Sequence, residues 1–258
     1  MSLRYEIAEG LTEITLDRPD VLNSIDEATA RELTAAIDRA EHDDHARAVL
    51  LRGEGRAFSA GRDLRGADPL NEDARAILAD LFNPLIQRVA DTAVPTFAAV
   101  QGACLGVGLG LALACDVVIA AEDARIGSPF ANIGAVLDSG AHLAFVQRVG
   151  AHRALELVYT GRLLSGTEAA AMGLVNGAVP HGDLHDHVRA MAASVAAGPT
   201  GAFAHSKRIV RRIVDEGLGL PQVLAAEAEA QGAVAGGADY VEGITAFLEK
   251  RRPDFKGG

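Results

Sequence analysis

Apolar and polar residues follow one another along the first half of the chain in a rhythm of strands and helices. Short apolar strands are predicted at 11–19 and 47–53, and helical spacing of apolar side chains covers residues 25–39 between them. The rhythm recurs further along, with a helix predicted at 81–90 and a strand at 95–100. Repeated units of this kind are typical of an α/β fold, here built from β-β-α turns.

A long apolar run, residues 97–121, contains only Gln101 and Asp116 as polar side chains. Its length matches the roughly 20 residues that cross a bilayer. Glycines divide the run, however, and predict a strand, a glycine turn, a helix at 109–115 and a second strand at 117–121. Because buried parallel strands are also continuously apolar, we predict core segments here and no membrane span.

The chain becomes mostly helical beyond residue 140. The segment AAGPT ends one helix and precedes the last helical segments, which places a soft boundary at 197–200. We therefore predict a core of residues 1–197 and a C-terminal helical region of residues 198–258. The helices predicted in this part of the chain cover 142–150, 152–161, 166–173, 185–198, 202–214 and a segment that begins at Pro221.

Composition narrows the classes of partner. The 258 residues carry a net charge of −11, which disfavours nucleic acid and anionic membrane surfaces as partners. Two basic clusters, 207–212 and 250–252, are expected to be solvated helix faces. Cys104 and Cys115 lack the spacing of a metal site or a disulfide framework, and the first ten residues lack the pattern of a signal peptide. We expect no metal and a cytoplasmic location.

The segment CLGVGLGLALACD, residues 104–116, places three alternating glycines in an apolar run. It matches neither the dinucleotide fingerprint nor the P-loop motif. One interpretation is that the glycines allow a strand and a helix to pack closely. The other is that the chain breaks at Gly106 and leaves the N–H of Val107 unpaired at the positive end of a helix, where it would hold an oxyanion. The segment alone leaves both open.

An oxyanion hole usually needs a second donor. The segment GRAFSAGRDL, residues 55–64, follows a predicted strand and contains Gly61 where the backbone must bend. It is therefore the candidate for the second strand-to-turn break.

Four segments together closely resemble the crotonase (enoyl-CoA hydratase/isomerase) superfamily, and the resemblance covers almost the whole chain. They are residues 55–64, 95–134, 161–180 and 242–255. The resemblance implies a spiral of β-β-α turns followed by a C-terminal helical trimerisation region. It further implies acyl-CoA thioesters as ligands, with coenzyme A as part of the substrate and no separate cofactor, and a homotrimer or a dimer of trimers as the assembly.

The resemblance also implies roles for individual residues. The backbone N–H groups of Arg62 and Val107 would be the two oxyanion donors that stabilise a thioester enolate. Phe247 and Lys250 would contact the nucleotide part of a coenzyme A bound to a neighbouring subunit. The other residues placed at the substrate are Ala60, Gly61, Asp63, Leu64, Gly106, Phe130 and Leu137.

Enoyl-CoA hydratases activate water between two glutamates, and the matching positions here are Gly110 and Phe130. Neither residue transfers protons. The nearest carboxyl is Asp138, in the loop IGAVLDSGAH, and the family's isomerases of ring-opened phenylacetyl-CoA epoxides and Δ3,Δ2-enoyl-CoA use an aspartate there to move a proton. We therefore expect an acyl-CoA isomerase in which Asp138 is the single base, its pKa raised by apolar Phe130, Val136 and Leu137.

Several alternatives stay open at this point. Asp138 or Ser139 could simply cap the following helix, and His142 could orient the carboxylate. The dehalogenase branch uses an aspartate of this loop as a nucleophile, although its tryptophan near Phe130 is absent here. A hydratase that relies on Asp138 alone, a thioesterase-like enzyme and a non-catalytic acyl-CoA binding protein are the remaining options. The acyl group is unreadable, because the variable segment 67–82 is expected to line its pocket.

Overall fold

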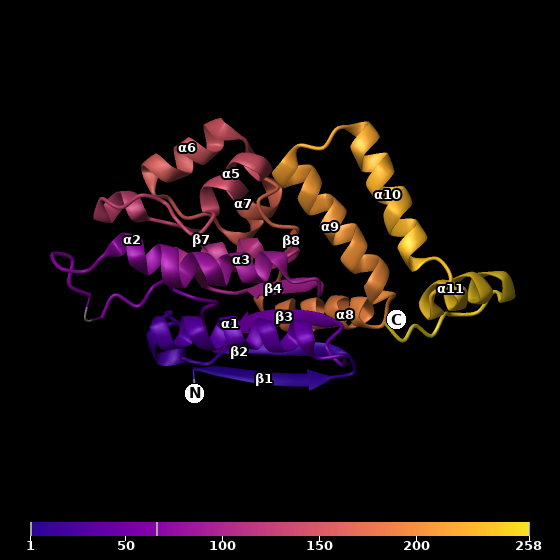
Figure 1. Ribbon diagram of the computed structural model, residues 1–258. Helices are drawn as coiled ribbons and strands as arrows, with labels where there is room; N and C mark the ends of the chain where they lie inside the picture. Colours follow the sequence, from indigo (N-terminus) through magenta and orange to yellow (C-terminus); the bar gives the residue numbers. More distant parts are fainter. Residues whose placement is uncertain (1, 66, 258) are drawn as a thin grey trace.

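The computed structural model describes residues 2–65 and 67–257. Its main sheet has six strands in the order β1-β2-β3-β4-β6-β8, and β5 pairs with β7 in a small second sheet (Figure 1). Only the β1–β2 pair is antiparallel among the described strand pairs. The strands are β1 (Leu3–Ala8), β2 (Leu11–Leu16), β3 (Ala48–Gly53), β4 (Thr96–Val100), β5 (Ala103–Leu105), β6 (Val117–Ala121), β7 (Arg125–Gly127) and β8 (Gly177–Val179).

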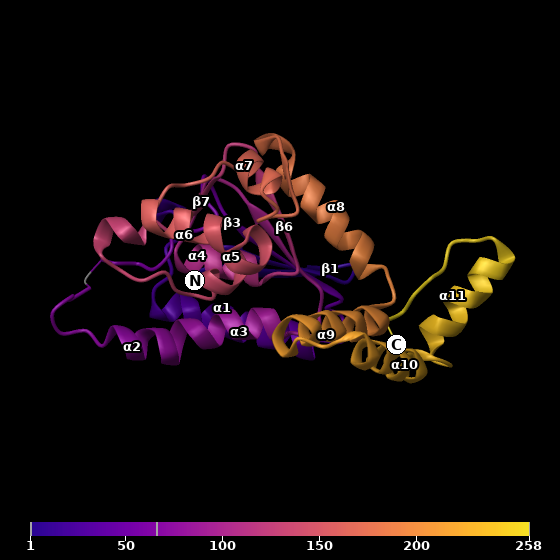
Figure 2. The ribbon, with the colours of Figure 1, turned by 90° about the horizontal axis from the view of Figure 1, so that it is seen from above.

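Helices cover both faces of the main sheet. In Figure 2, α1 and α3 lie on one side of the strands and α8 lies on the other, where it packs on the central strands β3 and β4. A π-helical turn, Leu78–Phe82, joins α2 to α3, and short 3₁₀ turns occupy Pro19–Val21, Phe130–Ile133 and His181–Asp183. The α-helices are α1 (Glu27–His42), α2 (Ala74–Ile77), α3 (Asn83–Asp91), α4 (Val107–Ala114), α5 (Ala141–Val149), α6 (Ala151–Thr160), α7 (Gly166–Ala171), α8 (Leu184–Ala196), α9 (Thr200–Glu216), α10 (Leu220–Val234) and α11 (Ala238–Glu249).

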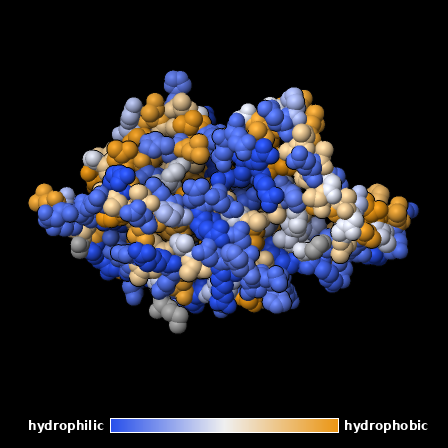
Figure 3. All heavy atoms as spheres, viewed as in Figure 1, coloured by the Kyte–Doolittle hydropathy of each residue, from blue (hydrophilic) through white to orange (hydrophobic). Residues whose placement is uncertain are grey.

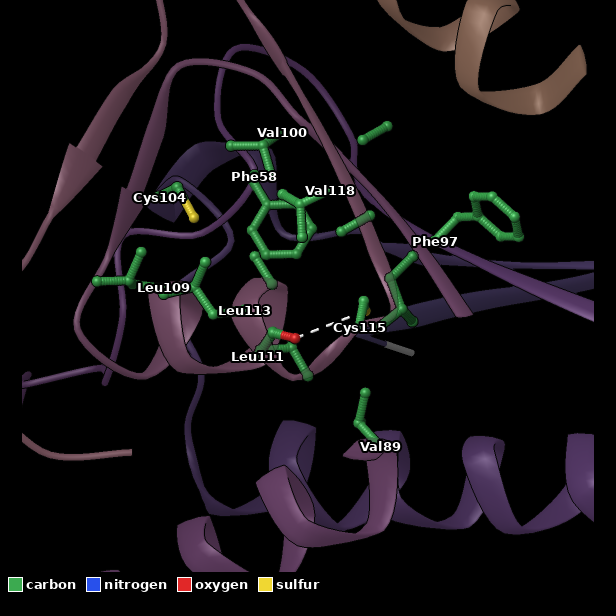
Figure 4. Close-up of a cluster of buried hydrophobic side chains, with 14 of the residues drawn as sticks. Phe58, Val89, Phe97, Val100, Cys104, Leu109, Leu111, Leu113, Cys115 and Val118 are labelled. Carbon is green, nitrogen blue, oxygen red and sulfur yellow. Dashed lines mark hydrogen bonds between the residues drawn. The ribbon is translucent and has the colours of Figure 1, made fainter. Parts of the chain in front are cut away.

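The long apolar run forms the centre of the core, as predicted. All five residues of β4 are buried, and so are seven of the eight residues of α4. Figure 4 shows Phe58, Leu109, Leu111 and Val118 packed together, with the Cys115 thiol 3.6 Å from the carbonyl oxygen of Leu111. No helix in the described part of the chain is long and apolar enough to cross a membrane.

Asp116, the charged residue within this apolar run, joins β4 to the later helix α9 through its carboxylate. Its Oδ2 accepts hydrogen bonds from the backbone N–H and the hydroxyl of Thr96, at 2.8 and 3.0 Å. The same oxygen lies 2.8 Å from the Nζ of Lys207 in α9. This charge therefore joins the start of β4 to the C-terminal helices.

The predicted elements with strong periodicity are confirmed, and the short ones were missed. Sequence patterns placed a helix at 25–39 and a strand at 47–53, where the structure has α1 and β3. The helix predicted at 81–90 begins earlier, at Ala74, because a π-helical turn shifts its apolar spacing. β1 was also missed, although its six residues alternate in burial as a half-buried strand does. β5, β7 and β8 have three residues each and are too short to show a period.

The predicted boundary at 197–198 falls in the turn between α8, which ends at Ala196, and α9, which begins at Thr200. Beyond it, α9, α10 and α11 extend to one side of the core (Figures 1 and 2). Arg47, in the segment before β3, contacts both ends of this region. Its guanidinium donates to the carbonyl oxygens of Gly198 and Phe255, at 2.7 and 3.1 Å.

Candidate active site

Two turns lie side by side at the ends of β3 and β5. A parallel bridge joins Ser59 to Cys104: the Ser59 N–H donates to the Ala103 oxygen at 2.9 Å, and the Leu105 N–H donates to the Ser59 oxygen at 3.0 Å. Gly61 has a φ of +93°, and a methyl group added to it would lie 2.7 Å from the Leu105 oxygen. Only glycine fits both the left-handed backbone and this close approach.

The Arg62 N–H lies at the free edge of the first turn. Arg62 is bridged to Ile25 through its neighbours: the Ile25 N–H donates to the Gly61 oxygen at 2.8 Å, and the Asp63 N–H donates to the Ile25 oxygen at 2.9 Å. In a parallel bridge of this form, the N–H of the central residue points away from its partner. Within residues 2–65 and 67–257 the Arg62 N–H has no acceptor, so it is available to a ligand.

The Val107 N–H is available for a different reason. Val107 is the first residue of α4, and the first N–H groups of a helix have no intrahelical partner. The Gly106 N–H donates to Gly127, whereas the helical ladder begins with the Gly110 N–H, which donates to Gly106 at 3.0 Å. In the described structure the Val107 N–H therefore has no acceptor, and it lies at the positive end of a buried helix.

Phe130 forms one wall beside these donors. Gly106 has a φ of +52°, and a methyl group added to it would lie 3.3 Å from ring atoms of Phe130. Leu137 is also buried, but Val136 is 79% exposed in this chain. The prediction that Val136 shields Asp138 was therefore wrong, because this part of the loop points its side chains to the surface.

Gly110 lies where the resemblance predicts the first glutamate of a hydratase, and no side chain fits there. A methyl group added to Gly110 would overlap both the Cβ and the carbonyl oxygen of Ser139. The loop that carries Asp138 and Ser139 thus packs directly on α4, one turn after Val107. This contact explains the third glycine of the sequence motif, and it brings Asp138 to the same end of α4 as the Val107 N–H.

Asp138 is half-buried in this loop. Burial raises the pKa of its carboxyl above the ordinary value, while the hydrogen bond from Ser139 and the charges of His142 and Arg62 oppose the rise. The Ser139 hydroxyl donates to Oδ1 of Asp138 at 2.8 Å. A carboxyl with a raised pKa is a stronger base than a solvated one, which suits proton transfer at carbon.

Neither Asp138 nor Ser139 caps α5 with its side chain, so that alternative is wrong. The N-cap is Gly140, which has no side chain to donate or accept, and the bond at this end runs from the Ala141 N–H to the backbone oxygen of Asp138 at 3.1 Å. His142 is exposed, and no hydrogen bond joins it to Asp138 among the described residues. The Asp138 carboxylate therefore makes no capping hydrogen bond at the start of α5.

Arg62 has a side-chain role that sequence reasoning missed. Its guanidinium forms a bidentate pair with Glu72, at 3.0 and 2.7 Å, and holds the pKa of that carboxyl below its usual range. The pair links the first turn to the variable segment 67–82, at a residue just before α2. No local signal in the sequence joins these two residues.

The Asp63 carboxylate is engaged within the protein. It accepts two bonds from the Arg65 guanidinium, at 2.6 and 3.0 Å, which lower the pKa of Asp63 well below its usual range, and Arg18 lies 3.3 Å from it. Ala60 and Gly61 lie beside it in the same turn, while the Leu64 side chain is exposed.

Phe247 and Lys250 lie far from this site within one chain. Both are exposed at the end of α11, which stands at the opposite end of the molecule from α5 and α6 in both ribbon views (Figures 1 and 2). The structure therefore brings together Gly61, Arg62 and Asp138 with their neighbours, and leaves the two α11 residues apart.

Several cations of the two basic clusters form ion pairs, and both cysteines are buried. Lys207 pairs with Asp116, Arg211 with Asp91 and Arg251 with Glu242, so both basic clusters contain ion pairs. The Lys207 side chain is only 12% exposed, which corrects its assignment to a solvated face. Burial raises the pKa of both thiols, that of Cys115 to about 12. No cluster suited to a metal ion occurs among the described residues.

Comparisons with known proteins agree with this geometry. The enoyl-CoA hydratase/isomerase family model matches residues 6–258. A Rhodobacter capsulatus protein named "Probable enoyl-CoA hydratase" is 43% identical over 258 residues, which cover 99% of this chain and 98% of that protein. The 1,2-epoxyphenylacetyl-CoA isomerase of Escherichia coli K12 is 34% identical, with 97% of each chain covered.

The fold of this chain also matches that of known members of the family. The crystal structure of an enoyl-CoA hydratase from Bacillus anthracis superposes with a TM-score of 0.94 and 31% identity, over 100% of both chains. The sheet, the paired glycine turns and the C-terminal helices are thus those expected from the motifs. The chain belongs to the enoyl-CoA hydratase/isomerase family, the crotonase superfamily.

Proposed function

We propose that this protein is an acyl-CoA isomerase that acts on enoyl-CoA or ring-epoxide CoA thioesters. The Asp138 carboxylate removes a proton from the carbon beside the thioester carbonyl of a 3-enoyl substrate. The electron pair moves to the carbonyl oxygen, and the enolate is held by the N–H groups of Arg62 and Val107. Protonated Asp138 then returns the proton two carbons further along, which moves the double bond without gain or loss of atoms.

The contact between Gly110 and Ser139 is the observation that carries this proposal. Ser139 occupies the space that a side chain at position 110 would need, so no glutamate fits there. Asp138, the residue before Ser139, is the carboxyl that the proposal uses instead. A single base suits the transfer of one proton between two carbons, whereas addition of water usually uses two groups. Phe130, at the second glutamate position, supplies an apolar wall and no acid.

Hydration is the second candidate, because the 43% identical relative is named a probable enoyl-CoA hydratase. In that reaction Asp138 would activate the water without a second carboxyl. A panel of 2-enoyl and 3-enoyl thioesters in deuterated water separates the two reactions by product mass. Isomerisation leaves the mass of the thioester unchanged except for hydrogen exchanged with deuterium, while hydration adds the mass of one water molecule.

The decisive variant is Asp138→Asn, which keeps the size of the side chain and removes the base. We expect isomerisation to fall at least about 100-fold, the lower range for loss of a general base, while binding of acyl-CoA persists. Unchanged turnover of 3-enoyl-CoA would overturn the assignment. An acyl-aspartate found by mass at residue 138 of the parent protein would replace it with nucleophilic chemistry, and binding without turnover of any thioester would favour a binding protein.

The C-terminal helices supply the second part of the proposal, a trimer or a dimer of trimers. In the described chain α9 buries no residue, and α11 exposes Tyr240, Val241, Ile244, Phe247 and Leu248. Figure 3 shows apolar residues gathered at the end of the molecule where α11 lies. Such an apolar surface favours a subunit contact. Phe247 and Lys250 would then reach the coenzyme A of a neighbouring subunit, and light scattering of the purified protein tests the assembly.

A further inference from the structure

Ser139 combines three features in one residue. It is 4% exposed, its φ of +55° lies in the left-handed region, and its hydroxyl donates to Oδ1 of Asp138 at 2.8 Å. A non-glycine residue in this region carries backbone strain of about 1 kcal/mol or more, which the surrounding structure must hold in place. The loop therefore keeps a strained serine where glycine would be easier to accommodate.

The packing around Ser139 fixes the direction of its side chain. Its Cβ and carbonyl oxygen lie directly against Gly110 of α4, so close that no methyl group fits between them. The following residue, Gly140, is the N-cap of α5, and the Asp138 carbonyl accepts the Ala141 N–H. Ser139 is thus held between two helices, and its hydroxyl has Asp138 as its side-chain partner.

The two oxygens of Asp138 consequently differ. Oδ1 accepts the Ser139 hydroxyl, whereas Oδ2 has no hydrogen-bond partner in the part of the chain that the structure describes. An oxygen that already accepts a strong hydrogen bond is the weaker base of the pair.

We propose that Ser139 is a positioning residue: it holds Oδ1 of Asp138 and leaves Oδ2 as the oxygen that takes the substrate proton and returns it. This inference deepens the proposed isomerase and rests on it. Ser139 itself touches no reacting atom in the proposed mechanism. It acts by fixing the rotation of the carboxylate and by setting the strength of the base.

Two other ionisable side chains, His142 and Arg62, lie near Asp138. His142 approaches from α5, and Arg62 approaches from the turn after β3 and is already paired with Glu72. Both lower the pKa of Asp138, as Ser139 does, while burial raises it. α4 faces this contact with Gly110, and none of its eight residues carries a charge. Ser139 is the one group bonded directly to the carboxylate among the described residues.

The test uses two variants, Ser139→Ala and Ser139→Gly, in the full-length protein. Both remove the hydroxyl, but only glycine relieves the left-handed backbone. The pKa of Asp138 is followed by ¹³C NMR of the labelled carboxyl, with Asp138→Asn used to assign the signal. The pH profile of kcat/KM for 3-enoyl-CoA is measured in parallel, and thermal unfolding confirms that each variant folds.

We expect both variants to raise the pKa of Asp138, and the acid limb of kcat/KM, by about one unit, because one charge-assisted hydrogen bond is lost. We also expect kcat to fall about tenfold with little change in KM, since a carboxylate free to rotate is a poorer base. A shift in both variants supports the proposal. Titration of both variants like the parent overturns it, and so does a shift in Ser139→Gly alone, because relief of the backbone strain would then be the cause.

The NMR titration separates this proposal from the proposed function. If Asp138→Asn keeps full turnover, Asp138 is not the base, and the isomerase mechanism fails whatever the serine variants do. If Asp138→Asn is inactive but neither serine variant moves the titration or kcat, the isomerase stands and the role of Ser139 is overturned.

Discussion

The two proposed oxyanion donors are backbone groups, so ordinary side-chain substitution leaves them in place. Val107 offers an unusual route to one of them, because it is the first residue of α4. Proline is tolerated at this position of a helix, since the missing N–H had no intrahelical partner. The preceding residue, Gly106, has no Cβ to clash with the proline ring.

Val107→Pro should therefore fold and lose about 10²- to 10³-fold in kcat, the usual cost of one oxyanion-hole donor. Val107→Ala keeps the N–H and should retain most of the rate. Steady-state kinetics and circular dichroism of the two variants make the comparison. Equal losses in both, with intact folds, would show that the N–H of residue 107 does not touch the substrate.

The titration of Asp138 predicts the direction of two pH effects. Because the pKa is raised in the folded state, kcat/KM should fall as the pH drops through it and the base becomes protonated. For stability the sign is opposite: the folded state binds this proton more tightly than the unfolded state does. The stabilisation is complete below the unfolded pKa and is lost as the pH rises through the folded pKa.

At pH 7 the Asp138→Asn variant should consequently be as stable as the parent or more stable, by about 1 kcal/mol or less. At pH 4 this advantage should shrink. Thermal unfolding of both proteins at the two pH values measures the difference. A variant that is clearly less stable than the parent at pH 7 would mean that the charged carboxylate stabilises the fold.

Residue-level predictions succeeded where the signal was local. Gly61, Gly106 and Val107 could be placed because glycines after predicted strands mark turns. The contact of Ser139 with Gly110 could not be predicted, because the two residues lie 29 positions apart and meet only when α4 and the loop before α5 pack together. The assignment of Val136 to the apolar wall failed for a related reason, since a loop has no period that fixes the direction of its side chains.

At the scale of elements, α4 connects the chemistry to the core. Its first residue carries the proposed oxyanion donor, Gly110 contacts the loop of Asp138, and its apolar residues belong to the buried core (Figure 4). Gly110→Ala should push this loop away and cost about 1–3 kcal/mol of stability, the usual cost of overpacking. It should also reduce kcat, because Asp138 moves with Ser139.

Gly201→Ala is the matched control for this prediction. Gly201 lies in the first turn of α9, and a methyl group there would meet nothing within 4 Å. The same chemical change should leave activity unchanged and raise stability slightly, because alanine favours a helix more than glycine does. Chemical denaturation and kcat of the two variants settle the matter, and equal behaviour would refute the role of the contact.

Apart from β1, strands of five residues or more could be predicted, and the three-residue strands could not. The strands β2, β3, β4 and β6 each have at least five residues and carry the apolar runs that identified the fold class. The three-residue strands β5 and β7 gave no such signal, although their pairing places Gly106 beside Gly127. The site thus depends on elements that only the family resemblance could supply from the sequence.

At the scale of the whole molecule, the C-terminal region is extended but anchored. Arg47 binds the carbonyl oxygens of Gly198 and Phe255, the two ends of this region. The carboxylate of Asp239 accepts the N–H groups of Lys256 and Gly257, at 2.7 and 2.9 Å. These bonds fix where α11 begins and ends, so that its exposed face is presented in one orientation.

Substitution of Lys250 tests whether the exposed face of α11 binds coenzyme A. It follows α11 with a φ of +57°, its side chain is exposed, and the proposed role is to hold a phosphate of coenzyme A on a neighbouring subunit. Lys250→Gln removes the charge and keeps a polar chain of similar reach. Loss of one charge-assisted hydrogen bond should weaken coenzyme A binding about tenfold, and the remaining affinity should depend less on salt.

Lys256→Gln is the control, because that lysine already pairs with Asp254 at 2.6 Å and lies in the anchored tail. Both substitutions remove one positive charge from the same region, so a general effect of net charge would weaken binding equally. Calorimetric titration of coenzyme A at low and high salt, together with light scattering, distinguishes the two. If Lys250→Gln binds like the parent while the assembly is intact, α11 serves the subunit contact alone and the phosphate is held elsewhere.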